Sequence, residues 1–184
     1  MTVDQDPYVL PDGLPVPEDD GAADHLPGAP LPDLELPSSR GTVNVRDFEV
    51  LYVYPRTGRP GRPMLAGWDE IPGARGCTPQ SCSFRDHAAE LAALGARVAG
   101  LSAQPLDDQV EFAERNRMPF PIVSDEWLDL ARTLGLPTFE IEGLTLYKRL
   151  TLIAQRGTIA KVFYPVFPPD RNAQDVVDWL GQRR

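Results

Sequence analysis

Two cysteines, Cys77 and Cys82, are the residues of this 184-residue sequence best suited to covalent chemistry. They are its only cysteines, and they lie together in the segment GCTPQSCSFRD at 76–86. Free cysteines are often small buried hydrophobic residues. A zinc site needs more ligands than two cysteines, and the chain has only the histidines His25 and His87. The position of Cys77 favours a reactive thiol over both of these alternatives.

Cys77 stands at the start of a predicted helix that runs to about Leu94, with Pro79 in its first turn and Gly95 after its end. The first turn of a helix offers free backbone N–H groups and the positive end of the helix dipole, which stabilise a thiolate. The loop that precedes the helix adds positive charge from four arginines: Arg56, Arg59, Arg62 and Arg75. We therefore expect Cys77 to react as an anion.

A buried strand is predicted to position this helix. Residues 50–54 are a continuous apolar and aromatic run ended by Pro55, which is typical of a strand buried on both faces at the centre of a sheet. Residues 56–76 form a loop too long for a simple connection, which favours either a lid or a disordered insert. Because ligands bind at the carboxyl edge of open α/β sheets, the site is expected at that edge.

Strands and helices are expected to alternate along the rest of the chain. A β-hairpin is expected around the turn at 38–41. The expected strands cover 97–102, 120–123, 147–154 and 159–164, and the expected helices cover 106–117, 126–134 and 172–182. The helix at 106–117 is expected to carry an apolar face of Leu106, Val110 and Ala113. This order predicts an α/β sandwich, with a central mixed sheet flanked by helices.

The N-terminal segment has a different composition, and residues 1–31 are predicted to be an acidic, proline-rich arm. The first 32 residues hold seven prolines, too many for a helix. Nine acids and one arginine within residues 1–40 give a charge of −8, so the remainder carries −1 of the formal −9. The arm is either disordered or held against the domain or a second subunit by its apolar residues: Tyr8, Leu10, Leu14, Val16 and Leu26.

Composition and charge exclude several classes of protein. The hydrophobic fraction of 42% and aromatic fraction of 8% are ordinary for a globular domain, expected here at 32–184. A nearly neutral domain lacks the basic patch that binding to nucleic acid requires. No apolar run is long enough to span a membrane. The acidic start MTVDQDPYVLPDG is unlike a signal peptide, so a cytoplasmic location is expected.

From Pro32 onward the sequence resembles peroxiredoxins of the PrxQ (bacterioferritin-comigratory-protein) type. The most specific matching segment is the one at 76–86. The segments that match fall in order along the chain: PDLELP at 32–37, LYVYP at 51–55, GCTPQSCSFRD at 76–86, VAGLSAQ at 98–104, MPFPIVSDE at 118–126 and KRLTLIAQRGTIAKVFY at 148–164. The resemblance implies a thioredoxin-like fold and a thiol-dependent peroxidase for hydrogen peroxide or organic hydroperoxides. It further implies recycling by a thioredoxin-like reductant, with no cofactor or metal, in a monomer or homodimer.

The resemblance also implies a role for each site residue. Cys77 matches the peroxidatic thiol that attacks peroxide, and Cys82 matches the resolving thiol that closes a disulfide with it. Arg149 matches the arginine that holds the thiolate and the peroxide oxygens. Pro55 matches the proline that shields the thiolate, and Gln80 matches the polar residue one turn into the helix.

The sequence departs from the family pattern just before Cys77. In the family the proline lies close before the cysteine, and a Thr or Ser lies three residues before the cysteine. Here Pro55 lies 22 residues upstream and Ala74 occupies the hydroxyl position. Thr57 or the loop backbone is expected to supply the missing hydrogen bonds. The missing hydroxyl keeps open a second function, a redox sensor or disulfide carrier with weak peroxidase activity. The acidic arm keeps open a third, a binding module whose arm and loop contact a partner and whose thiols are incidental.

Overall fold

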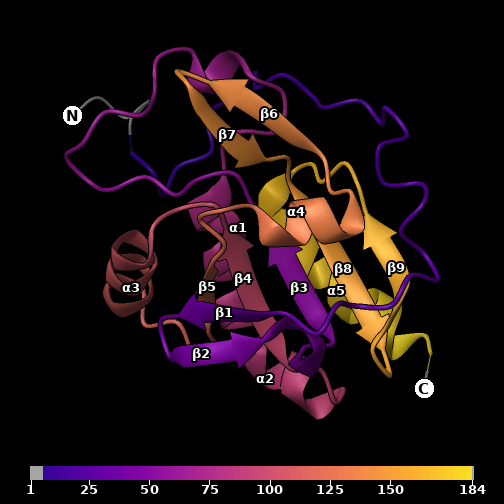
Figure 1. The fold of residues 1–184 in the computed structure, drawn as a ribbon. Helices are drawn as coiled ribbons and strands as arrows, with labels where there is room; N and C mark the ends of the chain where they lie inside the picture. The colour runs from indigo at the N-terminus through magenta and orange to yellow at the C-terminus, as the bar shows by residue number, and fades with distance from the viewer. Residues whose placement is uncertain (1–5, 184) are drawn as a thin grey trace.

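The computed structural model describes residues 6–183, which form a seven-stranded mixed sheet in the order β2-β1-β5-β4-β3-β8-β9 and a separate two-stranded sheet of β6 and β7 (Figure 1). The strands are β1 (Glu35–Ser38), β2 (Gly41–Asn44), β3 (Val50–Val53), β4 (Val98–Ser102), β5 (Ile122–Ser124), β6 (Thr138–Ile141), β7 (Leu144–Tyr147), β8 (Leu150–Gln155) and β9 (Thr158–Phe163). The α-helices are α1 (Cys77–Asp86), α2 (Ala88–Ala93), α3 (Leu106–Arg115), α4 (Asp129–Leu134) and α5 (Asn172–Gly181). Short 3-10 helices cover Val45–Asp47, Trp68–Glu70 and Pro169–Arg171. The predicted fold class, a central mixed sheet flanked by helices, is confirmed.

Strand β3 lies inside the sheet, as the apolar run at 50–54 predicts. It pairs in parallel with β4 and antiparallel with β8, and all of its residues are buried. Val50 and Tyr52 belong to one core cluster, whereas Leu51 and Val53 belong to the other. Because side chains alternate along a strand, β3 supplies both faces of the sheet with core residues.

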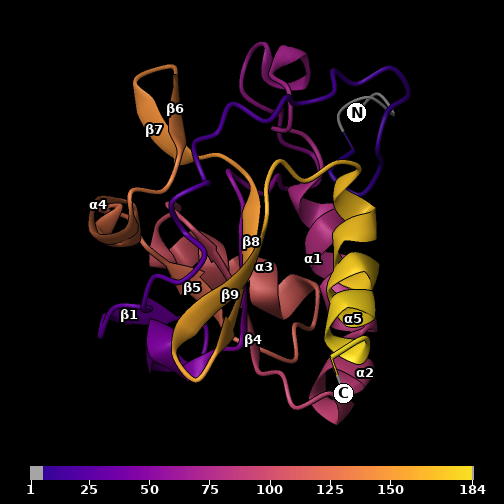
Figure 2. The same ribbon diagram turned by 90° about the vertical axis from the view of Figure 1, so that its right-hand side faces the viewer.

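Helices cover one face of the sheet, and helix α4 with part of the N-terminal arm covers the other. Helices α1 and α5 lie side by side on the first face (Figure 2). There the Phe84 ring of α1 stacks on Tyr52, with 4.4 Å between ring centroids. On the second face, Leu130 of α4 joins Leu26 and Leu31 of the arm in the core cluster of Leu51. Helix α1, which begins with Cys77, is therefore fixed to the centre of the sheet by aromatic packing.

The N-terminal arm is held along the edge of the domain. The backbone N–H groups of Gly28 and Leu31 donate to Ile159 O and Gly157 O, both at 2.8 Å. Leu26 and Leu31 are almost fully buried, with exposures of 0% and 1%. Figure 1 shows this indigo segment passing beside β9 before it enters β1. Of the two states that the sequence leaves open, residues 6–31 adopt the one packed on the domain.

The helix expected from Cys77 to about Leu94 is in fact two helices, α1 and α2, which meet at His87. The backbone of His87 has φ −96° and ψ 7°, outside helical values. Its ring Nδ1 lies 2.8 Å from the Ser83 carbonyl oxygen, which also accepts the His87 backbone N–H at 3.0 Å. The His87 ring thus shares the Ser83 carbonyl with the His87 backbone N–H, and α1 ends at Asp86, its tenth residue.

The buried face of α3 also differs from the expected one. Ala113 is buried as expected, but its companions are Phe112 and Gln109, whereas Leu106 and Val110 are only partly buried. The Gln109 amide nitrogen donates to Ser102 Oγ and to the Val123 carbonyl, both at 2.8 Å. A polar side chain is stable in the core when its hydrogen bonds are satisfied, which hydrophobic periodicity does not reveal.

The hairpin formed by β6 and β7 is absent from the sequence-based prediction. Tyr147, expected to begin the strand at 147–154, instead ends β7, and β8 begins at Leu150. The hairpin turns at Glu142 and Gly143, which both have left-handed φ angles, of 48° and 76°. A glycine between two alternating apolar segments is the signal that could have revealed this turn. Within residues 6–183, no helix is long and apolar enough to cross a membrane.

Candidate active site

Cys77 is the first residue of α1, and the glycine before it determines how the helix begins. Gly76 has a φ of 109°, a conformation that L side chains rarely adopt. A Cβ atom at Gly76 would also lie only 2.3 Å from Pro169 Cγ and 2.9 Å from Leu10 Cδ2. The first turn of α1 contains no acidic residue and has no side-chain cap. The partial positive charge of its N–H groups therefore lies beside the Cys77 sulfur without a competing carboxylate in that turn.

The guanidinium group of Arg149 directly contacts the Cys77 sulfur. Its Nη2 donates to Sγ at 3.2 Å, and both side chains are buried, with residue exposures of 3%. The other described partners of Arg149 are all uncharged oxygens, those of the Gly73, Ala74 and Arg75 carbonyls and the Gln80 amide. The positive charge of Arg149 therefore remains available to an anionic sulfur.

The Cys77 sulfur has two hydrogen-bond partners, the Arg149 Nη2 donor and the Ala74 carbonyl acceptor, which lies 3.6 Å from Sγ. A neutral thiol donates to the carbonyl and accepts from Arg149. A thiolate has no proton to donate and keeps only the hydrogen bond that it accepts from Arg149 Nη2. The same geometry thus accommodates the resting thiol and the reactive anion.

Sheet pairing brings Arg149 to Cys77 from far along the sequence. Strands β3 and β8 run antiparallel with Val53 opposite Leu150. Arg149, one residue before Leu150, therefore lies at the edge where β3 ends and Pro55 follows. Helix α1 begins at the same edge. Strand β8, which follows Arg149, therefore runs beside β3, which ends just before Pro55.

Gln80 fixes the direction of the Arg149 side chain. It lies one turn into α1 with an exposure of 0%, and its Oε1 accepts a hydrogen bond from Arg149 Nη1. Its Nε2 donates to Asn172 Oδ1 at 3.1 Å, and Thr151 Oγ1 donates to the same oxygen at 2.6 Å. The guanidinium is thus connected to β8 and α5 through a buried chain of hydrogen bonds.

Pro55 is buried and lines a cavity of about 400 Å³ that reaches Arg149. Six segments of the chain line the cavity. They contribute Val16, Pro17 and Glu18 of the arm, Pro55, Ile71, Pro72 and Gly73, Phe139 of β6, and Lys148, Arg149, Tyr164, Pro165 and Val166. Most of these side chains are apolar, with charged groups supplied by Glu18, Lys148 and Arg149.

The structure does not bring Thr57 into the cluster around Cys77. The Thr57 backbone N–H donates to Gln104 Oε1 at 3.0 Å, and Gln104 Nε2 donates to Thr57 Oγ1 at 3.2 Å. The loop backbone does reach the site, but through the carbonyl groups of Gly73, Ala74 and Arg75, which accept from Arg149. It thus supplies acceptors that orient the guanidinium, whereas the sequence led us to expect donors.

Two anchors hold this part of the loop at the site. Trp68, only 2% exposed, packs with Ala74 and Leu146 of β7. The buried Arg75 guanidinium donates to both carboxylate oxygens of Asp69, at 2.8 and 2.9 Å. The part of the loop from Trp68 to Arg75 is therefore packed in the structure, and Trp68 and Ala74 pack against the β6–β7 hairpin through Leu146.

Cys82, in the second turn of α1, has a different environment. It is partly buried, and its Sγ lies 3.8 Å from Asn116 Oδ1. Burial raises the pKa of the Cys82 thiol, and the nearby Asp86 carboxylate raises that pKa further. Both cysteines are free thiols in the structure. Within residues 6–183, no three His, Cys, Asp or Glu side chains are grouped to hold a metal ion.

Comparison with known proteins identifies the family. The AhpC/TSA family matches residues 68–162, more than half of the chain. The chain belongs to the AhpC/TSA family. The matched range includes α1 with both cysteines, as well as Arg149.

Relatives of this AhpC/TSA protein are named peroxiredoxin Q, which confirms the resemblance found in the sequence. Chloroplastic peroxiredoxin Q of Gentiana triflora is 27% identical over 158 residues, covering 83% of this chain and 65% of the relative. The Triticum aestivum protein is 28% identical over 150 residues, covering 79% of this chain and 62% of the relative. The chain therefore spans slightly less than two thirds of the length of these curated relatives.

Solved structures confirm the thioredoxin-like peroxiredoxin fold. Peroxidoxin BcpB of Mycobacterium tuberculosis superposes with a TM-score of 0.70 and 27% identity, covering 87% of this chain and 99% of that chain. Peroxiredoxin Q of Xanthomonas campestris superposes with a TM-score of 0.66 and 23% identity, covering 84% and 96%.

Sequence reasoning missed two parts of this AhpC/TSA site. Asn172, which binds Gln80, gives no signal beyond its place at the start of a helix. The carbonyl groups of residues 73–75 leave no trace in the sequence, because every residue has one. Both contacts depend on how distant segments pack, so spacing along the chain does not reveal them.

Proposed function

We propose that this AhpC/TSA protein is a thiol peroxidase that reduces hydrogen peroxide or an organic hydroperoxide at Cys77. The observation that carries the proposal is the 3.2 Å contact between Arg149 Nη2 and Cys77 Sγ at the start of α1. In the first step the Cys77 thiolate attacks one peroxide oxygen and the O–O bond breaks. Cys77 becomes a sulfenic acid, and the other oxygen leaves as water or an alcohol after it takes up a proton.

Arg149 has two tasks in this step. Its guanidinium stabilises the thiolate before the attack, and it stabilises the negative charge that develops on the departing oxygen. Its rigid arrangement of donors suits two adjacent oxygens better than the single ammonium group of lysine would. Gln80 keeps this arrangement in place by accepting a hydrogen bond from Nη1.

The cavity beside Arg149 supports the entry of an organic hydroperoxide. Its volume of about 400 Å³ and its largely apolar lining suit a substrate with a hydrocarbon body. Pro55 contributes an apolar wall there and lacks an N–H group that would bind water. In this proposal Pro55 limits the access of water to the reacting sulfur.

Cys82 completes the first half of the cycle. Its sulfur attacks the Cys77 sulfenic acid, the S–O bond breaks, and a Cys77–Cys82 disulfide and one water molecule form. Positions five apart on an intact helix lie about 8–9 Å apart, whereas a disulfide needs Cα atoms within about 7 Å. The first turns of α1 must therefore unwind locally. A thioredoxin-like dithiol then donates two electrons and restores both thiols.

Stopped-flow oxidation of the reduced protein by hydrogen peroxide and by cumene hydroperoxide tests the proposal. We expect rapid oxidation of Cys77, followed by an intramolecular disulfide that mass spectrometry of proteolytic peptides detects. Cys77→Ser is the control and should abolish the rapid reaction, whereas Cys82→Ser should retain it and go on to sulfinic acid. Oxidation of Cys77 no faster than that of an ordinary exposed thiol would contradict the proposal.

A second candidate function is a redox sensor or disulfide carrier with weak peroxidase activity. The observation that favours it is Ala74, which offers the sulfur a carbonyl acceptor where the family has a hydroxyl, while the Thr57 hydroxyl is bound to Gln104. The same experiment separates the two functions, because this alternative predicts slow oxidation that still ends in the disulfide. The division into an arm at 1–31 and a domain at 32–184, the cytoplasmic location and the monomeric or homodimeric state remain predictions from the sequence.

A further inference from the structure

A short piece of the N-terminal arm, residues 6–10, contacts the segment just before α1 and the end of α3, near both cysteines, and we call it the strap. At the Cys77 end, Arg75 Nη2 donates to the strap carbonyls of Asp6 and Val9, at 2.8 and 3.1 Å. Leu10 packs so closely on Gly76 that a Cβ atom there would lie 2.9 Å from Leu10 Cδ2. The strap therefore contacts the two residues that immediately precede Cys77.

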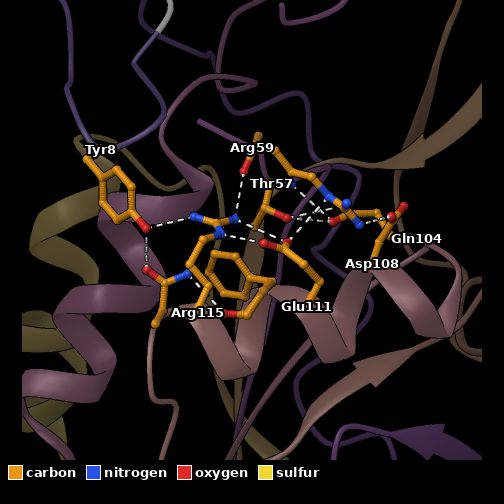
Figure 3. Close-up of polar contacts among 10 residues, drawn as sticks. Tyr8, Thr57, Arg59, Gln104, Asp108, Glu111 and Arg115 are labelled. Atoms are coloured by element: carbon orange, nitrogen blue, oxygen red, sulfur yellow. Dashed lines mark hydrogen bonds and ion pairs between the residues drawn. The ribbon is translucent and has the colours of Figure 1, made fainter. Parts of the chain in front are cut away.

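Near Cys82, the strap contacts the end of α3 through Tyr8. The Tyr8 hydroxyl donates to Asn116 Oδ1 at 2.8 Å and accepts from Arg115 Nη1 at 2.7 Å. Figure 3 shows the Tyr8 hydroxyl pointing at Arg115, which also binds Glu111. The same Asn116 Oδ1 lies 3.8 Å from the sulfur of Cys82. Tyr8 and the second cysteine thus share one acceptor atom.

Asn116 is well placed to transmit the effect of Tyr8 to α1. It is 3% exposed, and its Nδ2 donates to the Phe112 carbonyl at 2.9 Å, which fixes the amide. Its backbone carbonyl accepts from Nη1 of Arg85, a residue of α1, at 2.9 Å. Asn116 therefore binds α1 at Cys82 and at Arg85, and it binds the strap at Tyr8.

We propose that the strap controls the resolving step, with Tyr8 and Asn116 acting as positioning residues that hold Cys82 and the intact helix until the strap is released. The inference rests on the proposed function, since it concerns the second step of that cycle. In that step the Cys82 sulfur forms the S–S bond with Cys77, and the oxygen of the sulfenic acid leaves as water. The strap takes no part in the bond changes.

The physical reason is that unwinding α1 and keeping the strap in place exclude each other. The disulfide requires the segment from Gly76 to Cys82 to change shape, which displaces the surface under Leu10 and withdraws Cys82 from Asn116. The strap contacts therefore stabilise only the dithiol form. By thermodynamic reciprocity, the disulfide weakens strap binding as much as the strap opposes the disulfide.

This device sets the lifetime of the sulfenic acid. While the strap holds α1 folded, the Cys77 sulfenic acid stays out of reach of Cys82 and is exposed to a second peroxide molecule. That second reaction yields sulfinic acid, which a dithiol does not reverse. The strap should therefore make the protein more sensitive to inactivation at high peroxide, and a weaker strap should make it less so.

Tyr8→Phe is the variant that tests the strap. It keeps the ring, which lies 5.8 Å from the Arg115 guanidinium carbon, and removes only the hydroxyl group with its two hydrogen bonds. A matched control is His25→Ala, which removes an arm contact to the Leu134 carbonyl at α4, on the other face of the sheet from α1. We expect conversion of sulfenic acid to disulfide to be about five-fold faster in Tyr8→Phe, the value of one ordinary hydrogen bond. The control should resolve at the wild-type rate.

Rapid-quench mass spectrometry, in which the sulfenic acid is trapped with dimedone, follows the two steps separately. The rate of Cys77 oxidation should be the same in all three proteins, and the sulfinic acid fraction at excess peroxide should fall only in Tyr8→Phe. If Cys77 is oxidised and Tyr8→Phe resolves no faster than wild type, the strap proposal is wrong while the proposed function stands. An equal acceleration in His25→Ala would also overturn it, since the effect would then not be specific to Tyr8.

A second measurement needs no peroxide. Equilibration in a glutathione redox buffer measures how readily the Cys77–Cys82 disulfide forms, and Tyr8→Phe should shift this equilibrium about five-fold toward the disulfide, equal to about 20 mV. Chymotrypsin should also cut after Tyr8 faster in the oxidised than in the reduced protein. An unchanged equilibrium together with equal cleavage rates would overturn the proposal even if the protein proves not to be a peroxidase.

Discussion

Cys77 and Cys82 belong to the same helix, yet the structure gives them opposite surroundings. Cys77 is buried at the helix N-terminus with the Arg149 guanidinium 3.2 Å from its sulfur. Cys82 is partly exposed and faces the amide oxygen of Asn116, and its pKa is raised. A thiol that must attack first needs stabilisation of its anion, whereas a thiol that reacts second can stay neutral until the helix opens. The comparison shows that the difference comes from what packs on each turn of α1.

The largest expected effect comes from replacing Arg149, which should change the reactivity of Cys77 and leave that of Cys82 unchanged. Arg149→Met should slow oxidation of Cys77 by about 10²–10³-fold, as loss of one preorganised donor does in other enzymes. Arg149→Lys should slow Cys77 oxidation less than Arg149→Met does, because lysine keeps the positive charge. Stopped-flow peroxide kinetics measure both variants, and alkylation of Cys82 in the same proteins is the internal control. If Arg149→Met folds normally and oxidises at the wild-type rate, the assignment of the Cys77 environment is wrong.

A second prediction concerns the loop that carries the carbonyl acceptors of Arg149. Trp68→Ala removes a side chain that is 2% exposed and should lower the free energy of unfolding by about 3–5 kcal/mol. In Trp68→Ala the rate of alkylation of Cys77 should change, whereas the rate of alkylation of Cys82 should not. Urea titration measures the stability, and Trp127→Ala is the matched control, since Trp127 is 73% exposed and should change stability by no more than about 0.5 kcal/mol. Equal losses in the two variants would show that the loop is not anchored through Trp68.

Gln80 provides a smaller test on the Cys77 side. Gln80→Met keeps the volume but removes the acceptor of Arg149 Nη1 and the donor to Asn172, so Cys77 oxidation should slow by about ten-fold, or about 1.4 kcal/mol. Peroxide kinetics measure the change. Gln104→Met, which breaks the bonds to Thr57, is the comparison variant and should leave the rate of Cys77 oxidation within about two-fold of wild type. A larger loss of rate in Gln104→Met would indicate that the pair of Thr57 and Gln104 contributes to Cys77 oxidation.

The smallest expected effect is the pH dependence of Cys82. In the Cys77→Ser variant, alkylation of Cys82 with iodoacetamide should follow a titration whose midpoint lies above the ordinary thiol pKa of about 8.5. The folded state keeps this proton more firmly than the unfolded chain does. Its contribution to stability is therefore complete below about pH 8.5 and is lost as the pH rises toward the folded pKa. A midpoint at or below the value measured for an unfolded peptide would show that burial does not govern this thiol.

Much of the site could be predicted from residue types and order. The apolar run at 50–54 and the helix start at Cys77 lie where the sequence indicates, whereas the strand expected at 147–154 begins only at Leu150. The boundaries and partners were harder to predict. The break at His87, the burial of Gln109 and the hairpin at 138–147 each depend on particular hydrogen bonds or backbone angles. Periodicity describes which face of an element is apolar, and it does not describe which polar groups find partners.

The sequence by itself determined the fold class and the family resemblance, and it predicts that Cys77 is the reactive thiol, because these follow from local patterns and from a specific motif. Only the tertiary structure decided which groups meet that thiol. It placed Arg149 on the Cys77 sulfur, turned Thr57 toward Gln104 and used the loop carbonyls as acceptors. It also laid the arm residue Tyr8 beside Asn116, 108 positions away along the chain. Contacts between such distant residues arise from sheet register and packing, which no local pattern in the sequence specifies.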